Sequence, residues 1–317
     1  PCQIGPQNRG RVKWVQEIQR GLSFFAAAGA FGLGWSNVQL SPGFIAVSLA
    51  GLVAIVGLPH GALDPLVARQ AGLWRTPLGL AGFLIAYLLL AGVAGLLWFY
   101  APMLALIGFL AYSAWHFSGD WRDDLPLGLR LCAGVAIVSA PALLHRDLVT
   151  EYFSLLAGPR GAAALVQVLA WLALPALLGM ATAAARCRRD RWVISAELMV
   201  LATAAVMLTP LVLFLLYFCG LHSPRHLLHA AEGLNRKAAT ATAVGLTVIT
   251  VALAALVVVL GPPGRLDERL LQLTFIALAE PTVPHMVWIE YWDARAASLA
   301  SSQEAEQRGT TQRIKKG

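Results

Sequence analysis

Apolar runs of about 20 residues recur along this chain, and they constrain its fold more than any other feature. A helix of about 20 residues crosses the hydrocarbon core of a bilayer, which is about 30 Å thick, so each run predicts a membrane-spanning helix. Of the 317 residues, 58% are hydrophobic and only 13% are charged. Soluble domains carry about 25% charged residues. The predicted fold class is therefore all-α, a polytopic integral membrane helix bundle.

The apolar pattern predicts about ten helices in a single transmembrane helical catalytic domain, residues 20–295. A basic cytoplasmic segment, 1–19, precedes this domain. A polar tail, 296–317, follows it and is expected to be disordered. The expected helices span 20–37, 43–62, 77–99, 101–119, 126–145, 161–183, 192–209, 211–231, 240–260 and 268–291.

The distribution of Lys and Arg predicts the orientation, because cytoplasmic loops are enriched in these residues. With ten helices and the N-terminus in the cytoplasm, 20 of the 24 basic residues fall in cytoplasmic segments. The segments on the other side hold only Arg146, Arg160, Arg265 and Arg269. The pattern favours an N-in, C-in topology. The net charge of +7 lies in loops and helix flanks, which indicates contact with lipid and no nucleic acid partner.

Four histidines are predicted to meet inside this bundle: His60, His116, His222 and His226. They lie toward the ends of the second, fourth and eighth expected helices, which all run toward the cytoplasmic face. His222 and His226 are four residues apart and share one helix face. Ionisable groups are costly in apolar segments and usually mark function there. His285 in the tenth helix falls at a similar depth, whereas His145 lies on the opposite side.

An all-histidine set suits several metals, because neutral imidazole binds iron, zinc, copper and nickel. Tetrahedral zinc with four histidines would form a closed, structural site. A six-coordinate iron would keep open positions for dioxygen and a substrate. Axial ligation of haem is a further alternative.

Acidic residues near these histidines predict supporting hydrogen bonds. Asp64 follows His60 by four residues and Asp120 follows His116 by the same interval. Metal-bound histidines usually donate their second N–H to a carboxylate, carbonyl or water. Glu280 and His285 are assigned the same supporting role. The alternative is that Asp64 and Asp120 cap helix ends or face water.

Aromatic residues crowd the same end of the bundle, and they are interpreted as lining for a long apolar substrate. An interfacial aromatic belt is the alternative explanation. The residues nearest the histidines are Tyr112, Trp115, Phe117, Tyr217, Phe218 and Trp288.

Four local motifs resemble the Brp/Blh-type (bacteriorhodopsin-related-protein-like) β-carotene 15,15′-dioxygenase family, in order along the chain. The segment 57–64, GLPHGALD, is similar to the family's GxPHGAxD signature. The segment 115–117, WHF, with Asp120 resembles its second histidine motif. The segment 222–226, HSPRH, resembles HSxRH, and Pro284-His285 resembles a later PH element.

The resemblance implies an enzyme that uses non-haem iron(II) and O2 to cleave β-carotene at its central 15,15′ double bond. The products would be two retinal molecules that supply a microbial rhodopsin. His60, His116, His222 and His226 would be the iron ligands, and the carotenoid would enter from the lipid bilayer. The implied location is a prokaryotic cytoplasmic (inner) membrane. The alternatives are a membrane di-iron hydroxylase or desaturase, and a transporter or rhodopsin assembly partner without catalysis.

Overall fold

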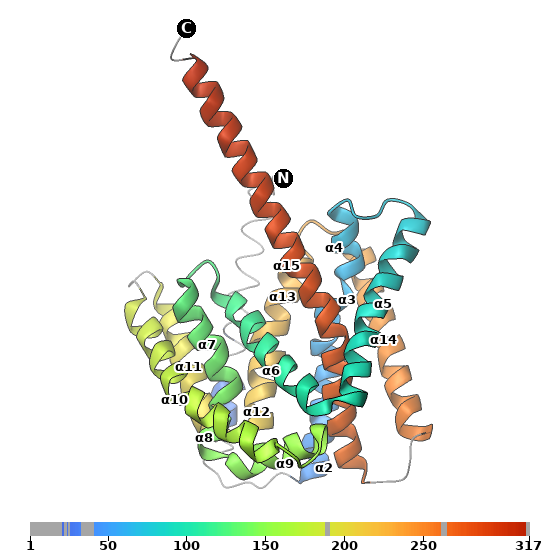
Figure 1. Ribbon diagram of the computed structural model, residues 1–317, viewed down its shortest axis with the longest axis vertical. Coiled ribbons are helices and arrows are strands. Elements are labelled where there is room, and N and C mark those ends of the chain that lie inside the picture. Colours follow the sequence, from blue (N-terminus) through green and yellow to red (C-terminus); the bar gives the residue numbers. More distant parts are fainter. Residues whose placement is uncertain are drawn as a thin grey trace.

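The computed structural model describes residues 21, 24, 26–32, 41–187, 191–260 and 265–314. These residues form helices joined by short turns, with no strand among them, and the helices pack side by side as a bundle (Figure 1). Large apolar side chains cover much of the outer surface of the bundle. The expected class, a helical multi-pass membrane protein, is confirmed.

Six helical stretches of the described residues are long and apolar enough to cross a membrane. They are α5 (Pro77–Tyr100), α7 with α8 (Leu127–Ser139, Pro141–Leu144), α10 (Ala162–Arg186), α12 with η4 and α13 (Pro210–Phe214, Leu215–His222, Ser223–Ala230), α14 (Arg236–Leu260) and the first part of α15 (Leu266–Ile314). Shorter helices occupy three further expected positions: α2 with η1 (Pro42–Leu52, Val53–Gly57), α6 (Pro102–Ser118) and α11 (Trp192–Met207). The count of ten spans and the N-in, C-in topology stay predictions.

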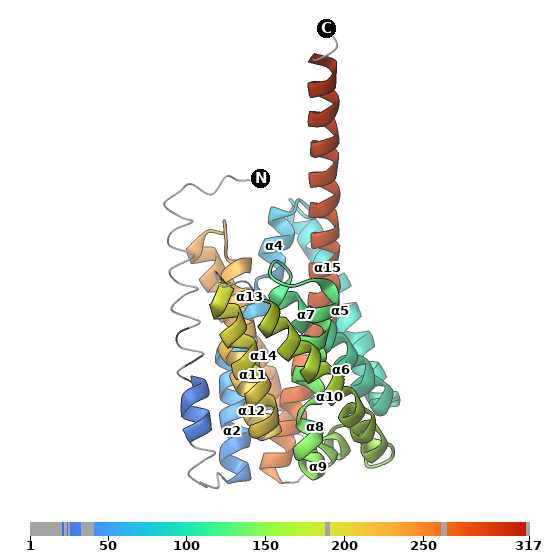
Figure 2. The same ribbon diagram turned by 90° about the vertical axis from the view of Figure 1, so that its left-hand side faces the viewer.

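One helix lies where a loop was expected. Helix α9 (Arg146–Ala157) buries Val149, Phe153 and Leu156, which recur every three or four residues along one face. Such spacing is typical of an amphipathic helix on the bundle surface. Together with α8 it lies at one end of the bundle, whereas α4 (Asp64–Gln70) lies at the other end (Figures 1 and 2).

The last helix differs from the expected disordered tail. Helix α15 continues as far as Ile314 and extends well beyond the other helices (Figure 2). The segment 294–307 contains neither glycine nor proline and is rich in Ala, Glu and Gln, which favour a helix. The polar composition of residues 296–317 was the basis for expecting disorder, but the helix propensity of this segment favours the helix that is observed as far as Ile314.

Two prolines shape the helices that carry the predicted ligands. Proline has no N–H to donate and crowds the carbonyl one turn back. Immediately before Pro59 and Pro224, the chain forms π-helical turns, η1 and η4. Leu58 donates to the carbonyl of Val53, and Ser223 donates to that of Phe218, so each hydrogen bond spans five residues. Such wide turns are rare and occur frequently at functional sites.

The helices of the bundle differ in how deeply they are buried. In the most apolar parts of α5 and α14, which are long enough to cross a membrane, no residue is buried. These two helices therefore lie at the periphery of the bundle. The largest core cluster is centred on α7, α10, α11 and η4, and its fully buried side chains include Trp121, Tyr217, Met180 and Leu198. This core fixes the helices that hold the histidines at mid-bundle.

Candidate metal centre

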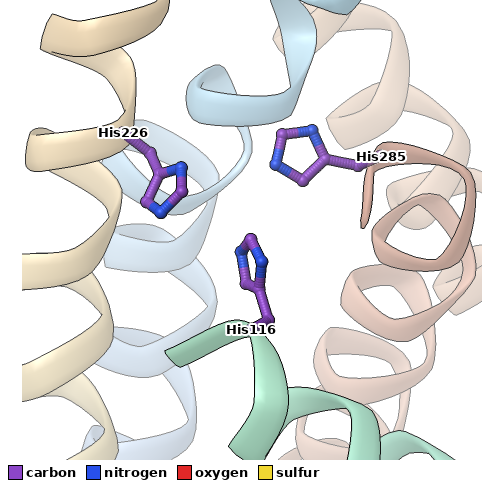
Figure 3. Close-up of side chains that lie close together, drawn as sticks. All are labelled: His116, His226 and His285. Atoms are coloured by element: carbon purple, nitrogen blue, oxygen red, sulfur yellow. The ribbon is translucent and has the colours of Figure 1, made fainter. Parts of the chain in front are cut away.

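Three histidines from three helices point toward one another in the bundle (Figure 3). His116 comes from α6, His226 from α13 and His285 from α15. Their ring centroids are 5.0 Å apart for His116 and His226, 5.8 Å for His116 and His285, and 6.5 Å for His226 and His285. These segments lie more than 50 residues apart in sequence, so only tertiary packing brings the rings together.

His222, at the end of η4, is the fourth member of this group, which we call the histidine cluster. Its ring lies 4.8 Å from that of His116 and 4.4 Å from that of His226, centroid to centroid. The side chain of His222 is fully buried. The rings of Phe117 and Phe218 pack against the His222 ring, with centroid-to-centroid distances of 4.9 and 5.7 Å.

The nitrogen atoms of the cluster lie close to the separation that one shared metal ion requires. A histidine nitrogen lies about 2.1 Å from a bound zinc ion, so two nitrogens that share one metal are at most about 4.2 Å apart. One ligand atom from each of His116, His226 and His285 lies within 4.8 Å of the others. Small side-chain adjustments are enough to close that difference. A donor set of neutral imidazoles suits iron, zinc, copper or nickel.

Asp120 supports the cluster from η2 (Gly119–Trp121). It accepts hydrogen bonds from Nδ1 of His222 at 3.1 Å and from the Tyr217 hydroxyl at 2.6 Å, and Nε2 of His226 lies 3.5 Å away. Burial by itself raises the pKa of Asp120, but its interactions with His222 hold that pKa well below its ordinary value. A carboxylate can only accept, so Nδ1 of His222 carries the proton and Nε2 carries the lone pair.

A second arrangement of the same kind holds His285. Its Nδ1 lies 2.9 and 2.8 Å from the two carboxylate oxygens of Asp64 on α4. The Tyr87 hydroxyl on α5 donates to Asp64 at 3.0 Å. A carboxylate on the outer nitrogen is the usual partner of a metal-bound histidine.

Both predicted carboxylates thus contact histidines, but their observed partners come from distant segments. Asp64, which was paired with His60 on one-turn spacing, bonds His285, and Asp120, which was paired with His116, bonds His222. The side chain of His60 lies outside the described part of the structure. Its helix, α3 (Pro59–Ala62), packs against both α13 and α15.

The other predicted residues lie in different surroundings. Phe117, Tyr217 and Phe218 are buried against His222. The other three aromatic side chains lie on α6 and α15: Trp115 donates to Glu290, Trp288 packs edge-on against Phe83, and Tyr112 is partly buried. Glu280 is partly buried on α15, where its carboxylate lies against Gly95 of α5.

Sequence reasoning missed a buried ion pair behind the cluster. Glu197 on α11 accepts from Arg225 at 2.8 Å and from the Trp121 indole at 2.9 Å. Arg225 also donates to the backbone carbonyl of Asp120 at 3.1 Å. The signal was present, because Glu197 is the only charged residue in the apolar stretch 193–207. Tyr87 offered no comparable signal.

Comparison with known proteins decides the family. The family model for Beta-carotene 15,15'-dioxygenase matches residues 51–293, a range that contains the whole histidine cluster and both of its carboxylates. The chain belongs to this family. The resemblance of the motifs is thereby confirmed, together with the expectation that the chain is an enzyme of the beta-carotene 15,15'-dioxygenase family.

Two relatives in this family match most of the length of the chain. The Beta-carotene 15,15'-dioxygenase of an uncultured marine bacterium, 66A03, is 32% identical over 255 residues, which is 76% of this chain and 91% of the relative. The Probable beta-carotene 15,15'-dioxygenase Blh of Halobacterium salinarum is 29% identical over 242 residues, 63% of this chain and 69% of the relative. No solved structure matches the chain.

Proposed function

We propose that this chain cleaves β-carotene at its central 15,15′ double bond with iron(II) and O2, giving two retinal molecules. The observation that carries the proposal is the family match over residues 51–293, which includes every described histidine of the cluster. In this reaction the central C=C bond breaks, each of its carbons gains one oxygen atom, and O2 is reduced as the polyene is oxidised. The bilayer supplies the apolar substrate.

The metal ligands in this proposal are His60, His116, His222 and His226. Bound iron(II) would supply the electrons that activate O2, chemistry that no protein side chain provides alone. The chain itself would hold and orient the imidazoles. Asp120 fixes the tautomer of His222, and the burial of His116, His222 and His285 keeps bulk water away from these rings.

The surroundings of the cluster suit an apolar substrate. Phe117 and Phe218 pack on the His222 ring and exclude polar solvent from that side. Trp115 and Trp288 lie on α6 and α15, the helices that supply His116 and His285. We assign these side chains, with Tyr112 and Tyr217, to positioning the polyene, since the placement of the reacting bond decides which bond breaks.

The membrane placement completes the proposal. With ten spans and both termini in the cytoplasm, the cluster lies in the cytoplasmic half of a prokaryotic inner membrane. Retinal released there would reach a microbial rhodopsin through the lipid. The distribution of Lys and Arg supports this orientation.

The test is retinal content, measured by chromatography, in β-carotene-accumulating cells that express the chain. Retinal should appear as carotene is consumed, and His222→Ala should abolish both changes. His229→Ala is the matched control, because this histidine of α13 has a side chain that is 83% exposed. Folded, iron-loaded protein that produces no retinal would refute the β-carotene assignment and favour a retinal-handling assembly partner.

A further inference from the structure

His285 was expected to support the metal site from outside, but its position is that of a ligand. We propose that His285 binds the metal directly and that Asp64 and Tyr87 hold it in the binding orientation; this inference rests on the proposed metal-dependent function. His285 is 3% exposed, and one of its ring nitrogens belongs to the group of ligand atoms within 4.8 Å of one another. Figure 3 shows its ring facing those of His116 and His226.

The hydrogen bonding of His285 decides which nitrogen would bind. Nδ1 lies within 2.9 Å of both oxygens of Asp64, and a carboxylate can only accept, so Nδ1 carries the proton. The lone pair is then on Nε2, an atom buried from solvent. The negative charge of Asp64 also makes that nitrogen a stronger base toward a metal.

The support around His285 repeats the support around His222. In both cases a tyrosine hydroxyl donates to a carboxylate that holds Nδ1 of a buried histidine. The two sets are Tyr87–Asp64–His285 and Tyr217–Asp120–His222. His222 is assigned as a ligand on its HxxxH spacing, its depth and its motif, and the same arrangement around His285 favours the same role.

Two further contacts restrict the His285 ring. The Tyr87 hydroxyl lies 3.2 Å from the carbonyl of Pro281, so α5 is tied to α15 one turn before His285. On another side, a Cβ atom added to Gly61 would lie 3.6 Å from Nδ1. The backbone of α3, next to His60, therefore lies against the ring. The ring is confined between α3 and α4, as a group with a fixed orientation requires.

The experiment measures cobalt(II) binding to the full chain in detergent, using cobalt alone as the probe. Chelator competition gives the affinity, and the visible absorption of cobalt(II) reports its ligands. His285→Ala should weaken binding by at least about tenfold and change the spectrum, and added imidazole should restore both. His229→Ala, which removes an exposed imidazole from α13, should leave affinity and spectrum unchanged.

A conservative variant distinguishes a loss of metal binding from a folding defect. Tyr87→Phe keeps the ring of residue 87 and His285 itself, and loses only the hydroxyl that contacts Asp64 and the carbonyl of Pro281. It should weaken cobalt binding by roughly tenfold, within the range found when partners of metal ligands are changed. Wild-type affinity in both His285→Ala and Tyr87→Phe would overturn the inference, as would a loss in His285→Ala that imidazole leaves unrestored while Tyr87→Phe binds normally.

Retinal formation separates this inference from the proposed function. If the wild-type chain makes retinal and His285→Ala binds cobalt as the wild type does, only the ligand role of His285 is refuted. If cobalt binding depends on His285 but the wild-type chain makes no retinal from β-carotene, the ligand role stands and the proposed reaction is refuted.

Discussion

Gly134 on α7 marks the closest approach of two helices, and its substitution tests whether helix packing positions the histidine cluster. A Cβ atom added at Gly134 would lie 2.1 Å from the carbonyl oxygen of Ala114 and 3.0 Å from the backbone nitrogen of Ser118. These two residues flank His116 on α6. Both contacts are with backbone atoms, so no side chain can rotate away to make room.

The expected displacement follows from these distances. Real Cβ contacts essentially never fall below 3.0 Å, so Gly134→Ala must separate α6 from α7 by about 0.9 Å. Overpacking of this kind typically costs about 1–3 kcal/mol of stability. Misplacing a reacting group by about 1 Å can cost about 100-fold in rate. We therefore expect Gly134→Ala to reduce cleavage by roughly 100-fold, because it moves His116.

The assay is the rate of retinal formation by purified protein in detergent, with thermal unfolding measured in parallel. Gly128→Ala is the matched control, because Gly128 lies on the same helix and a Cβ there meets nothing within 4 Å. That change should leave the rate intact and alter stability by no more than about 1 kcal/mol. Wild-type rate and melting temperature in Gly134→Ala would refute the claim that this contact sets the position of His116.

Three other perturbations address the supporting network and the metal. Tyr217→Phe removes the hydroxyl that donates to Asp120 and should weaken metal binding by about 10–100-fold in a chelator competition; unchanged affinity would contradict the supporting role. Glu197→Gln removes a buried charge that pairs with partly buried Arg225 and should lower the free energy of unfolding by roughly 3 kcal/mol, whereas exposed Glu268→Gln should leave it unchanged. Chelation should abolish cleavage, with activity returning on addition of iron(II); equal recovery with zinc(II) would argue against iron.

The sequence predicts most of the helices because each long apolar run has one physical outcome in a membrane. The run 77–99 became α5, and 161–183 became α10, with ends within three residues of the expectation. Short apolar helices are harder to classify: α6 has 17 residues, too few to separate a short span from a buried helix by length alone. Helix α9 was missed because its apolar face recurs only every three or four residues among polar ones.

The residues that form the histidine cluster could be predicted from their depth in the membrane. Shared depth and direction of the even-numbered helices grouped His116, His222, His226 and His285, and the structure places these four rings together. Depth alone carries no information about which helices are neighbours. It therefore could not separate a ligand from a supporting residue, and for His285 this distinction stays a prediction.

The partners of the two carboxylates show why spacing within one helix was insufficient. One-turn pairing requires a continuous helix from histidine to carboxylate. Helix α3 ends at Ala62 and α4 begins at Asp64, while α6 ends at Ser118 and Asp120 lies in a 3₁₀ turn. The observed hydrogen bonds of both carboxylates go to histidines on other helices. Asp64 thereby links α4 to α15, and Asp120 links η2 to η4, so the carboxylates join distant segments around the metal site.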